Sequence, residues 1–574
     1  MFRYALRRAS AQRLGKFKTA LASLQSRQWP SFYRRVHESV CSGLPSIHDP
    51  ILPKNDTIYA LSSGSGRAGI AVIRISGPGC LDVYRGLCPS KAPPKPRYAA
   101  VRTLLEPGSA DASGANIVDS DALVLYFPSP KTVTGEDVLE LHVHGGPATV
   151  KAVLSAVRKC SSAGTVRYAE PGEFTRRAFL NGRLDLAQVE SLGDTLAAET
   201  EHQRRAAVRG NSGVLGKTYD SWREQLLLAR GEIEALIDFS EDQHFDESPA
   251  ELLTNVTRLV GDILHSIQLH KLGSQRSEML RNGIRIALLG PPNAGKSSLM
   301  NQIVGREASI VSAEAGTTRD VVEASLDIRG YLCSFADTAG IRTKSSGSIS
   351  HSDHPTASTI GAIEEEGIRR ARQKALDSDV IIVLASVEMA ESGAYRISYD
   401  AETLQLAAGA QQCLVAVNKT DLVSPESLER LIQEFKASAL ADIGGLRDTK
   451  PLAISCKAAV SPPAAGLTDA GGIHALTEKL AESFSHLTSL PDDLQHLLGV
   501  TERQSQLLAE CERHLGDFMA EARKTDPYAE PDVVLAAEHL RLAALRLASI
   551  TGRGESGDVE DVLGVIFEKF CVGK

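Results

Sequence analysis

The sequence lacks the cysteine spacing of a disulfide-rich or zinc-binding protein. Its nine cysteines include no CxxC pair and stand mostly in apolar runs, which predicts reduced thiols and no cysteine zinc site. It also lacks an apolar stretch of membrane-spanning length, so we expect no membrane span. The net charge of −8 argues against nucleic-acid binding by bulk electrostatics and leaves only local basic faces for RNA contact.

Acidic residues are missing from the start of the chain as far as Glu38. Arginine and lysine are interleaved there with Ala, Ser, Leu and Phe, and no secretory hydrophobic core is present. An Arg-rich, acid-poor amphipathic segment is typical of a mitochondrial transit peptide. We therefore expect a transit peptide and linker over residues 1–54 and a location in the mitochondrial matrix. A disordered basic tail is the alternative interpretation.

A phosphate-binding loop is the most informative feature that is present. The apolar run 284–289 leads into Gly290-Pro291-Pro292-Asn293-Ala294-Gly295-Lys296-Ser297-Ser298, and a helix-like pattern follows through Val304. Such a loop turns backbone N–H groups around a phosphate, its lysine reaches the β/γ oxygens, and its serine holds Mg²⁺. The predicted nucleotide-binding residues here are Asn293, Ala294, Gly295, Lys296, Ser297 and Ser298.

The base is expected to bind at Asn418-Lys419-Thr420-Asp421, which follows the apolar run 414–417. The carboxylate of Asp421 can accept two hydrogen bonds from guanine, whereas adenine would place a lone pair against it, so we predict GTP. Ser455-Cys456-Lys457 follows another strand-like run and is expected to pack against guanine.

Two switch motifs stand between these loops. Thr318 in 315–320 is expected to close on Mg²⁺ and the γ-phosphate, while Asp337 lies beside the metal and the Gly340 N–H reaches that phosphate. Ile341 stands where Ras-type enzymes place a water-orienting glutamine. From the residues alone, Asn293 is either a ligand for a monovalent cation or a solvated loop residue. The glutamates 364–366 either orient water or open a helix.

The length of 574 residues suits three or four domains. Short strands and Gly/Pro turns from Asp56 to about residue 180 indicate an α+β domain, and the later leucine spacing indicates helices on both sides of the nucleotide-binding region. We therefore predict a Ras-like α/β G domain inserted in an all-α domain. The expected boundaries are 55–180 for the α+β domain, 181–282 and 488–574 for the helical domain, and 283–487 for the G domain, with a disordered insertion at 343–360.

Several motifs outside the G domain resemble the MnmE (TrmE) family of tRNA-modification GTPases. The similarity runs from about Asp56 to the end of the chain. The motifs are Gly66-Arg67-Ala68-Gly69-Ile70-Ala71-Val72-Ile73-Arg74-Ile75-Ser76-Gly77, Thr134-Gly135-Glu136-Asp137, His144-Gly145-Gly146-Pro147, Pro171-Gly172-Glu173-Phe174-Thr175, Ala178-Phe179-Leu180-Asn181 and Cys571-Val572-Gly573-Lys574.

The resemblance implies an activity and partners. It implies an amino-terminal domain that binds a reduced folate, 5-formyl- or methylene-tetrahydrofolate, and forms the homodimer. It also implies GTP hydrolysis that needs K⁺ and Mg²⁺. A FAD-dependent partner of the MnmG type, bound in a heterotetramer, would help to install an aminomethyl-type group on C5 of the wobble uridine of mitochondrial tRNAs.

The resemblance also assigns residues. Ser297 and Thr318 would hold Mg²⁺, Glu364 would orient water, and Cys571 would act near the folate. The family prefers lysine at the position of Arg183, and the long insertion departs from its short spacing. The K⁺ ligands implied are Asn293, Ser312, Glu314 and Thr317, and the folate ligands implied are Arg74, Glu140, Arg183 and Lys574.

Two further interpretations concern the ends of the chain and the function. Because Lys574 and Arg74 would bind one folate, we expect the tail to fold back onto the α+β domain, across a homodimer interface. His142 and His144 share one strand face without a third ligand, so we interpret them as structural. A GTPase for mitochondrial ribosome assembly and a folate carrier with a vestigial G domain are the alternatives. The folate motifs argue against the first and the intact nucleotide motifs against the second.

Overall fold

The computed structural model describes the chain from Asp56 onward, with gaps. The described residues are 56–109, 116–160, 166–238, 249–312, 325–335, 373, 377–391, 393–460, 469, 471–524, 531–553, 566, 567, 570 and 573. The expected transit peptide and the expected insertion at 343–360 lie outside them. Within these ranges, no helix is both long and apolar enough to cross a membrane.

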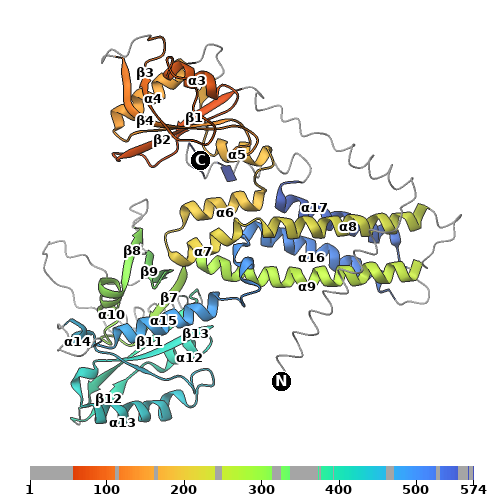
Figure 1. Cartoon of the computed structure of the whole chain (residues 1–574). Coiled ribbons are helices and arrows are strands. Elements are labelled where there is room, and N and C mark those ends of the chain that lie inside the picture. Colours follow the sequence, from red (N-terminus) through yellow and green to blue (C-terminus); the bar gives the residue numbers. More distant parts are fainter. Residues whose placement is uncertain are drawn as a thin grey trace, which may run out of the picture. The chain divides into compact units, whose positions relative to one another are not determined.

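A six-stranded sheet in the order β3-β4-β5-β2-β1-β6 forms the first part of the fold (Figure 1). Neighbouring strands are antiparallel except β1 and β6, which are parallel. Ala71, Ile73 and Ile75 of β2 alternate into the core under α3 and α4. The elements are β1 Thr57–Leu61, β2 Ile70–Ser76, α3 Cys80–Leu87, β3 Ala100–Leu105, β4 Ile117–Phe127, β5 Val138–His144, α4 Pro147–Lys159 and β6 Val166–Tyr168.

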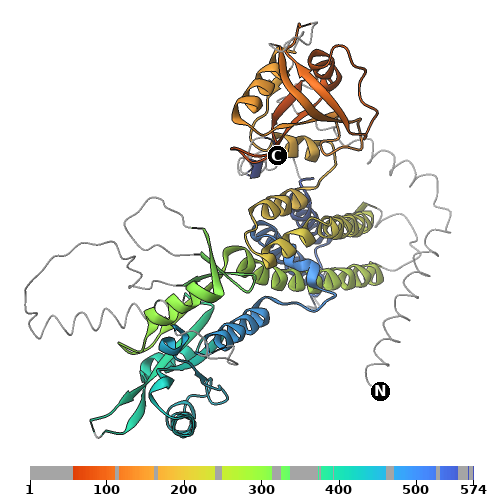
Figure 2. The same cartoon turned by 60° about the vertical axis from the view of Figure 1, so that its left-hand side comes forward.

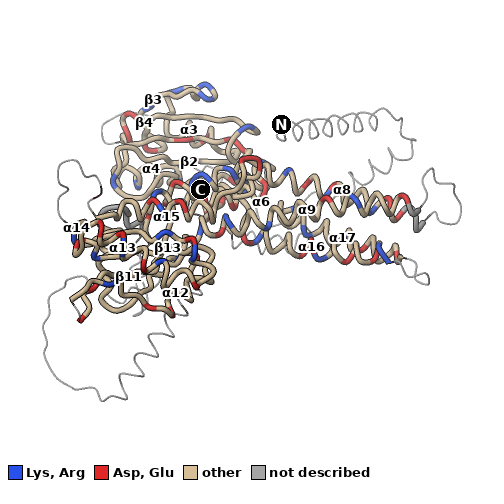
Figure 3. The backbone as a smooth tube through the Cα atoms, turned by 90° about the horizontal axis from the view of Figure 1, so that it is seen from below, with Lys and Arg blue, Asp and Glu red and all other residues tan. Residues whose placement is uncertain are grey.

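Helices from two separate stretches of sequence pack together. α17 packs against α8 and α16, and α16 also packs against α9 (Figures 1 and 2). Basic and acidic residues are interspersed along the α8 and α9 segments of the backbone (Figure 3), as expected for helices with solvated faces. The helices are α5 Glu173–Leu180, α6 Leu186–Ala197, α7 Glu201–Gly210, α8 Val214–Asp238, α9 Pro249–Asn282, α16 Glu502–Ala522 and α17 Val533–Thr551.

A second sheet lies between these two stretches in the sequence. Its main order is β14-β13-β11-β7-β10-β9-β8, with β12 paired to β11, and the five strands from β14 to β10 are parallel. β11 is an almost continuous buried apolar run, as expected for a central parallel strand. The strands are β7 Ile284–Leu289, β8 Ala308–Ser312, β9 Ser325–Ile328, β10 Tyr331–Phe335, β11 Val380–Met389, β12 Tyr395–Ser398, β13 Gln412–Asn418 and β14 Leu452–Ala453.

Helices accompany this second sheet. They are α10 Lys296–Gln302, α12 Ala401–Ala408, α13 Pro425–Phe435, α14 Cys456–Val460 and α15 Ile473–Thr488. The helix-like pattern after the phosphate-binding loop was expected to run through Val304, but α10 ends at Gln302 and a π-helical turn, Ile303–Glu307, follows.

Arg281 ties together the two points where the chain enters and leaves the second sheet. It stands near the end of α9, directly before β7, and its Nε donates to Asp194 Oδ2 at 2.7 Å. Its other nitrogens donate to the carbonyl oxygens of Val500 and Gly499, which precede α16. The guanidinium of Arg281 therefore holds the segment before β7 and the segment before α16 together through charge-assisted hydrogen bonds.

The end of the chain returns to the first sheet. Ser62 Oγ, directly after β1, donates to the carbonyl oxygen of Gly573 at 2.8 Å. Phe567 and Phe570 pack with Leu186 in a small apolar cluster. Gly172 has φ +67°, and a Cβ there would lie 2.5 Å from the Phe567 carbonyl oxygen, so only glycine fits. The tail thus returns to the α+β domain as expected, but the contact lies within one chain and not across the homodimer interface that the prediction invoked.

The α+β, helical and α/β segments expected from the sequence are all present. α5 ends at Leu180, α6 begins at Leu186 and β7 begins at Ile284, while the domain boundaries themselves stay predictions. His142 and His144 lie on the same face of β5, as alternation predicts.

Replacing Ile73 by alanine should destabilise the first sheet. Ile73 is fully buried, so we expect a loss of about 2–5 kcal/mol in the free energy of unfolding. Ile70 of the same strand is 65% exposed, and Ile70→Ala is the matched control. The free energy of unfolding of both variants is measured by urea denaturation, and hydrogen exchange of the β2 amides reports the local effect. Equal effects of the two substitutions would contradict the buried face assigned to β2.

Candidate functional site

The phosphate-binding loop joins β7 to α10, and two glycines set its course. Gly290 has φ +148°, and a Cβ there would lie 2.2 Å from the Leu384 carbonyl oxygen. Gly295 has φ +99°, and a Cβ there would lie 2.2 Å from Asn418 Nδ2. Both positions therefore require glycine for conformation and for space. Asn293 between them also has a positive φ, +62°, and is exposed.

Lys296 folds over this loop. Its Nζ donates to the carbonyl oxygens of Gly290 and Pro291, at 2.7 and 2.8 Å. Partial burial lowers the pKa of Lys296 from its ordinary value. Ser297 and Ser298 are exposed in the first turn of α10. The arrangement places one cation and the first backbone N–H groups of a helix at the same point, as phosphate binding requires.

Asn418 connects the phosphate-binding loop to the predicted base-binding loops. Its side chain is buried, with 3% exposure. Nδ2 donates to the Ala294 carbonyl oxygen at 2.8 Å, and Oδ1 accepts from the Cys456 N–H at 3.1 Å. Three loops that are far apart in the sequence thus meet on one amide, at the carboxyl ends of β7, β13 and β14.

Asp421 is held by the neighbouring predicted base loop. Ser455 Oγ donates to Asp421 Oδ1 at 2.6 Å and accepts from the Ala458 N–H at 3.0 Å. Thr420 Oγ1 donates to the Ile454 carbonyl oxygen at 2.9 Å. The carboxylate is exposed, so its second oxygen is free to face a base. The Lys457 side chain is also exposed.

Glu388 belongs to this site and was missed from the sequence. Lys419 has φ +63°, and its Nζ lies 3.1 Å from Glu388 Oε1 at the end of β11. Ser386 Oγ donates to the same oxygen at 3.0 Å. Although burial alone would raise the pKa of Glu388, its bonds to Lys419 and Ser386 lower it. The available signal was a carboxylate that ends an apolar strand-like run beside the base-binding strand.

Except for Ser312, the remaining predicted G-domain residues are outside the described chain. Ser312 is the last residue of β8, and only its backbone is described. The others are Glu314, Thr317, Thr318, Asp337, Gly340, Ile341 and Glu364. Their predicted roles stay predictions.

In the first sheet, Arg74 and Glu140 face each other across β2 and β5. Arg74 Nε donates to Glu140 Oε1 at 3.0 Å, and Arg74 NH2 lies 2.9 Å from the same oxygen. His142 Nε2 is 3.5 Å from Glu140 Oε2 and is buried without a hydrogen-bond partner in the described chain. The two residues predicted for folate thus form a half-buried ion pair, and His142 offers a further polar atom beside it.

Arg183 contacts a different segment. Its Nε donates to the Thr132 carbonyl oxygen at 2.9 Å. Two of the motifs that carried the resemblance meet nearby, because Arg177 NH1 lies 3.1 Å from Glu136 Oε2 and Arg177 NH2 lies 3.1 Å from Glu173 Oε1. Burial alone would raise the pKa of Glu173, but Arg167 and Arg177 hold it lowered. These motif residues support the fold around the predicted folate site.

Cys571 and Lys574 lie outside the described residues, although Gly573 between them contacts Ser62. The described cysteines are all free. Burial raises the pKa of Cys88 to about 11 and that of Cys160 to about 12. Thiols with raised pKa values are poor nucleophiles.

Two family models match the chain. Residues 57–183 match the amino-terminal region of the GTP-binding protein TrmE, and residues 186–571 match the MnmE helical domain. The second match spans both helical stretches and the sheet between them.

Relatives resemble the chain over nearly its full length. A zebrafish (Danio rerio) protein named 5-taurinomethyluridine-[tRNA] synthase subunit GTPB3, mitochondrial, is 37% identical over 94% of this chain and 96% of its own. The protein of the same name from Homo sapiens is 38% identical over 90% of this chain and 93% of its own. A tRNA modification GTPase MnmE from Parvibaculum lavamentivorans is 38% identical over 90% of this chain and 100% of its own.

Replacing Asp421 by asparagine should exchange the base preference. The asparagine oxygen can keep the bond from Ser455, but its NH₂ then meets the N1–H of guanine, and two donors face each other. We expect GTP affinity to fall at least about tenfold and xanthosine triphosphate affinity to rise. Fluorescent-nucleotide titration measures both. The control is Asp448→Asn at an exposed site of the same domain. Unchanged GTP affinity in Asp421→Asn would contradict base recognition by Asp421.

Proposed function

The chain belongs to the MnmE family of tRNA-modification GTPases, and from this premise we propose that it is a potassium-dependent GTPase modifying C5 of the wobble uridine of mitochondrial tRNAs. GTP hydrolysis in tRNA modification is the activity of the family; the cation, folate, partner and compartment are the proposal. The observation that carries it is the amide of Asn418, which holds the phosphate-binding and base-binding loops together beside Asp421.

The potassium requirement rests on two features of the chain. Ile341 cannot orient an attacking water, and no arginine finger is expected from the motifs. Asn293 is exposed on the phosphate-binding loop with its backbone held at φ +62°, so its side-chain oxygen is available to a monovalent cation near the phosphates. Ser312, Glu314 and Thr317 would complete the K⁺ site, Ser297 and Thr318 would hold Mg²⁺, and Glu364 would orient the water.

GTP hydrolysis should be several-fold faster in potassium than in sodium salts, because K⁺ at Asn293 would offset charge that develops on the leaving phosphate. Asn293→Ala should remove the difference. Asn301, exposed in α10, provides the control Asn301→Ala, which should keep it. Initial rates of phosphate release at equal ionic strength are the measurement. Equal wild-type rates in the two salts would exclude the potassium requirement.

The folate proposal rests on the return of the chain end. Gly573 contacts Ser62, and Ala60, two residues earlier on β1, pairs with Arg74. Two residues of strand and one interstrand step span about 7 and about 5 Å, so Gly573 lies near the Arg74–Glu140 pair. Glu140 can accept from the pterin ring, and the cationic residues can offset the folate carboxylates. Cys571 would then stand close to the one-carbon group of a bound reduced folate.

Cys571→Ser should abolish tRNA modification and leave GTP hydrolysis largely unchanged, because the nucleotide site lies on the other sheet. Cys160→Ser is the control, since Cys160 is half-buried against Gly86 in the first domain. Nucleoside mass spectrometry of tRNA from complemented cells measures modification, and phosphate release measures hydrolysis. Full modification by Cys571→Ser would overturn the role of this thiol.

The family and the sequence support a proposal for the partners and the compartment. The vertebrate relatives are named as mitochondrial and for 5-taurinomethyluridine, which favours taurine as the amine and agrees with the acid-poor start of this chain. We propose a homodimer that joins a FAD-dependent MnmG-type protein in the matrix. The G domain would be inserted in the helical domain, an arrangement supported by packing of α16 against α9.

A further inference from the structure

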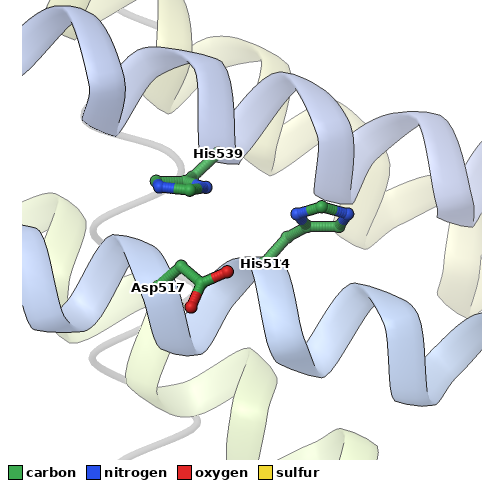
Figure 4. Close-up of side chains that lie close together, drawn as sticks. All are labelled: His514, Asp517 and His539. Carbon is green, nitrogen blue, oxygen red and sulfur yellow. The ribbon is translucent and has the colours of Figure 1, made fainter.

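The hairpin of α16 and α17 carries two histidines and an aspartate that no part of the proposed function uses. His514 and Asp517 are three residues apart on α16, and His539 lies on α17 opposite them (Figure 4). One potential ligand atom from each of the three lies within 4.8 Å of the others. We call these three residues the His–Asp–His cluster.

Both histidines have a buried nitrogen without a partner. Nδ1 of His514 and Nδ1 of His539 make no hydrogen bond within the described chain. His514 is itself 94% buried, since its exposed fraction is 6%. A buried polar atom without a partner is unfavourable, so such atoms usually have a ligand, an ion or a water. The second nitrogen of His514, Nε2, accepts from Arg513 NH2 at 3.2 Å.

Burial and the neighbouring cations act on the pKa of His514. Burial first, and then Arg513, Arg546 and His539, lower the pKa of His514, whereas Asp517 raises it. Arg546 is itself paired, because its Nε lies 2.9 Å from Glu510 Oε2. Arg513 is exposed and is the cation that most directly opposes a metal.

We propose that the His–Asp–His cluster binds one divalent transition-metal ion of the zinc class, with His514, Asp517 and His539 as ligands. Two imidazoles and one carboxylate suit Zn²⁺ or Co²⁺, whereas Mg²⁺ and Ca²⁺ prefer oxygen ligands alone. Zinc–ligand bonds of about 2.0–2.1 Å place tetrahedral ligand atoms about 3.3 Å apart, so small side-chain rotations bring the cluster to the metal. Asp517 is exposed, which leaves the fourth position to water.

Binding through Nδ1 of His514 moves the ring proton to Nε2. The Arg513 N–H can no longer donate there, and its exposed side chain must turn toward solvent. Arg513 therefore opposes the metal both by charge and by holding the wrong tautomer. The bound metal would clamp α16 to α17 and stabilise the helical hairpin.

The test uses the full chain with saturating Mg²⁺ and GDP, so that the nucleotide site is filled. Co²⁺ titration followed by visible absorption, and Zn²⁺ competition for the same site, give stoichiometry and affinity. We expect one Co²⁺ per chain with the absorption of a low-coordinate site. Asp517→Asn and His539→Gln should each lower the Co²⁺ affinity at least tenfold. His265, exposed on α9, provides the control His265→Gln, which should change nothing.

Arg513→Gln should change the Co²⁺ affinity in the opposite direction, which distinguishes a metal site from a structural role of the cluster. This substitution removes a cation and the hydrogen bond to His514 Nε2, so the His514 proton can move to Nε2. The Co²⁺ affinity should therefore rise severalfold. Zn²⁺ should raise the melting temperature of the wild type and not that of His539→Gln. Circular dichroism checks that each variant is folded. Co²⁺ binding that is absent, or equal in the wild type and in folded Asp517→Asn and His539→Gln, would overturn the proposal.

Discussion

The buried amide of Asn418 is the contact on which the nucleotide site depends. It donates to the phosphate-binding loop at Ala294 and accepts from the loop that begins α14 at Cys456, so it fixes the distance between the predicted phosphate and base positions. Gly295 must lack a Cβ for this amide to approach. Removing the Asn418 side chain would leave the Ala294 carbonyl oxygen and the Cys456 N–H without their hydrogen bonds. Leaving such buried groups unsatisfied destabilises the protein by more than the two hydrogen bonds stabilise it. Ser455, which orients Asp421, stands next to Cys456 in the sequence, and Lys419, which pairs with Glu388, stands next to Asn418.

Contacts at two other places join segments that are far apart in the sequence. Arg281, which stands just before β7, binds both Asp194 and the segment before α16, so one side chain links the two ends of the stretch that contains the second sheet. At the carboxyl end, Gly172 admits the Phe567 carbonyl, and Ser62 holds Gly573 beside β1. Gly573 thus contacts the residue that follows β1, and β1 pairs with the strand that carries Arg74, although Gly573 and Arg74 are about five hundred residues apart. The proposed folate chemistry and the GTP chemistry are therefore built on separate sheets joined through helices.

Much of the fold could be predicted because local patterns specify it. Alternation in β2, the continuous apolar run of β11 and the helical spacing in α6 each follow from which faces are buried. The phosphate-binding and base-binding loops could be found because their glycines and polar residues stand directly after strands. The pairing of Glu388 with Lys419, the burial of His142 Nε2 and the pairing of Arg177 with Glu136 could not, because each depends on contacts between residues distant in sequence. The π-helical turn after α10 also escaped, since hydrophobic spacing does not distinguish it from an α-helix.

In the proposed function, GTP hydrolysis on one sheet serves chemistry on the wobble uridine. The most direct measurement is nucleoside mass spectrometry of mitochondrial tRNA from cells that lack the protein, complemented with the wild type or with Lys296→Ala, which removes the phosphate-binding cation. We expect loss of a C5-modified wobble uridine without the protein, recovery with the wild type and no recovery with Lys296→Ala. Unchanged wobble uridines in cells without the protein would contradict the account and favour a GTPase that acts on RNA without modifying it.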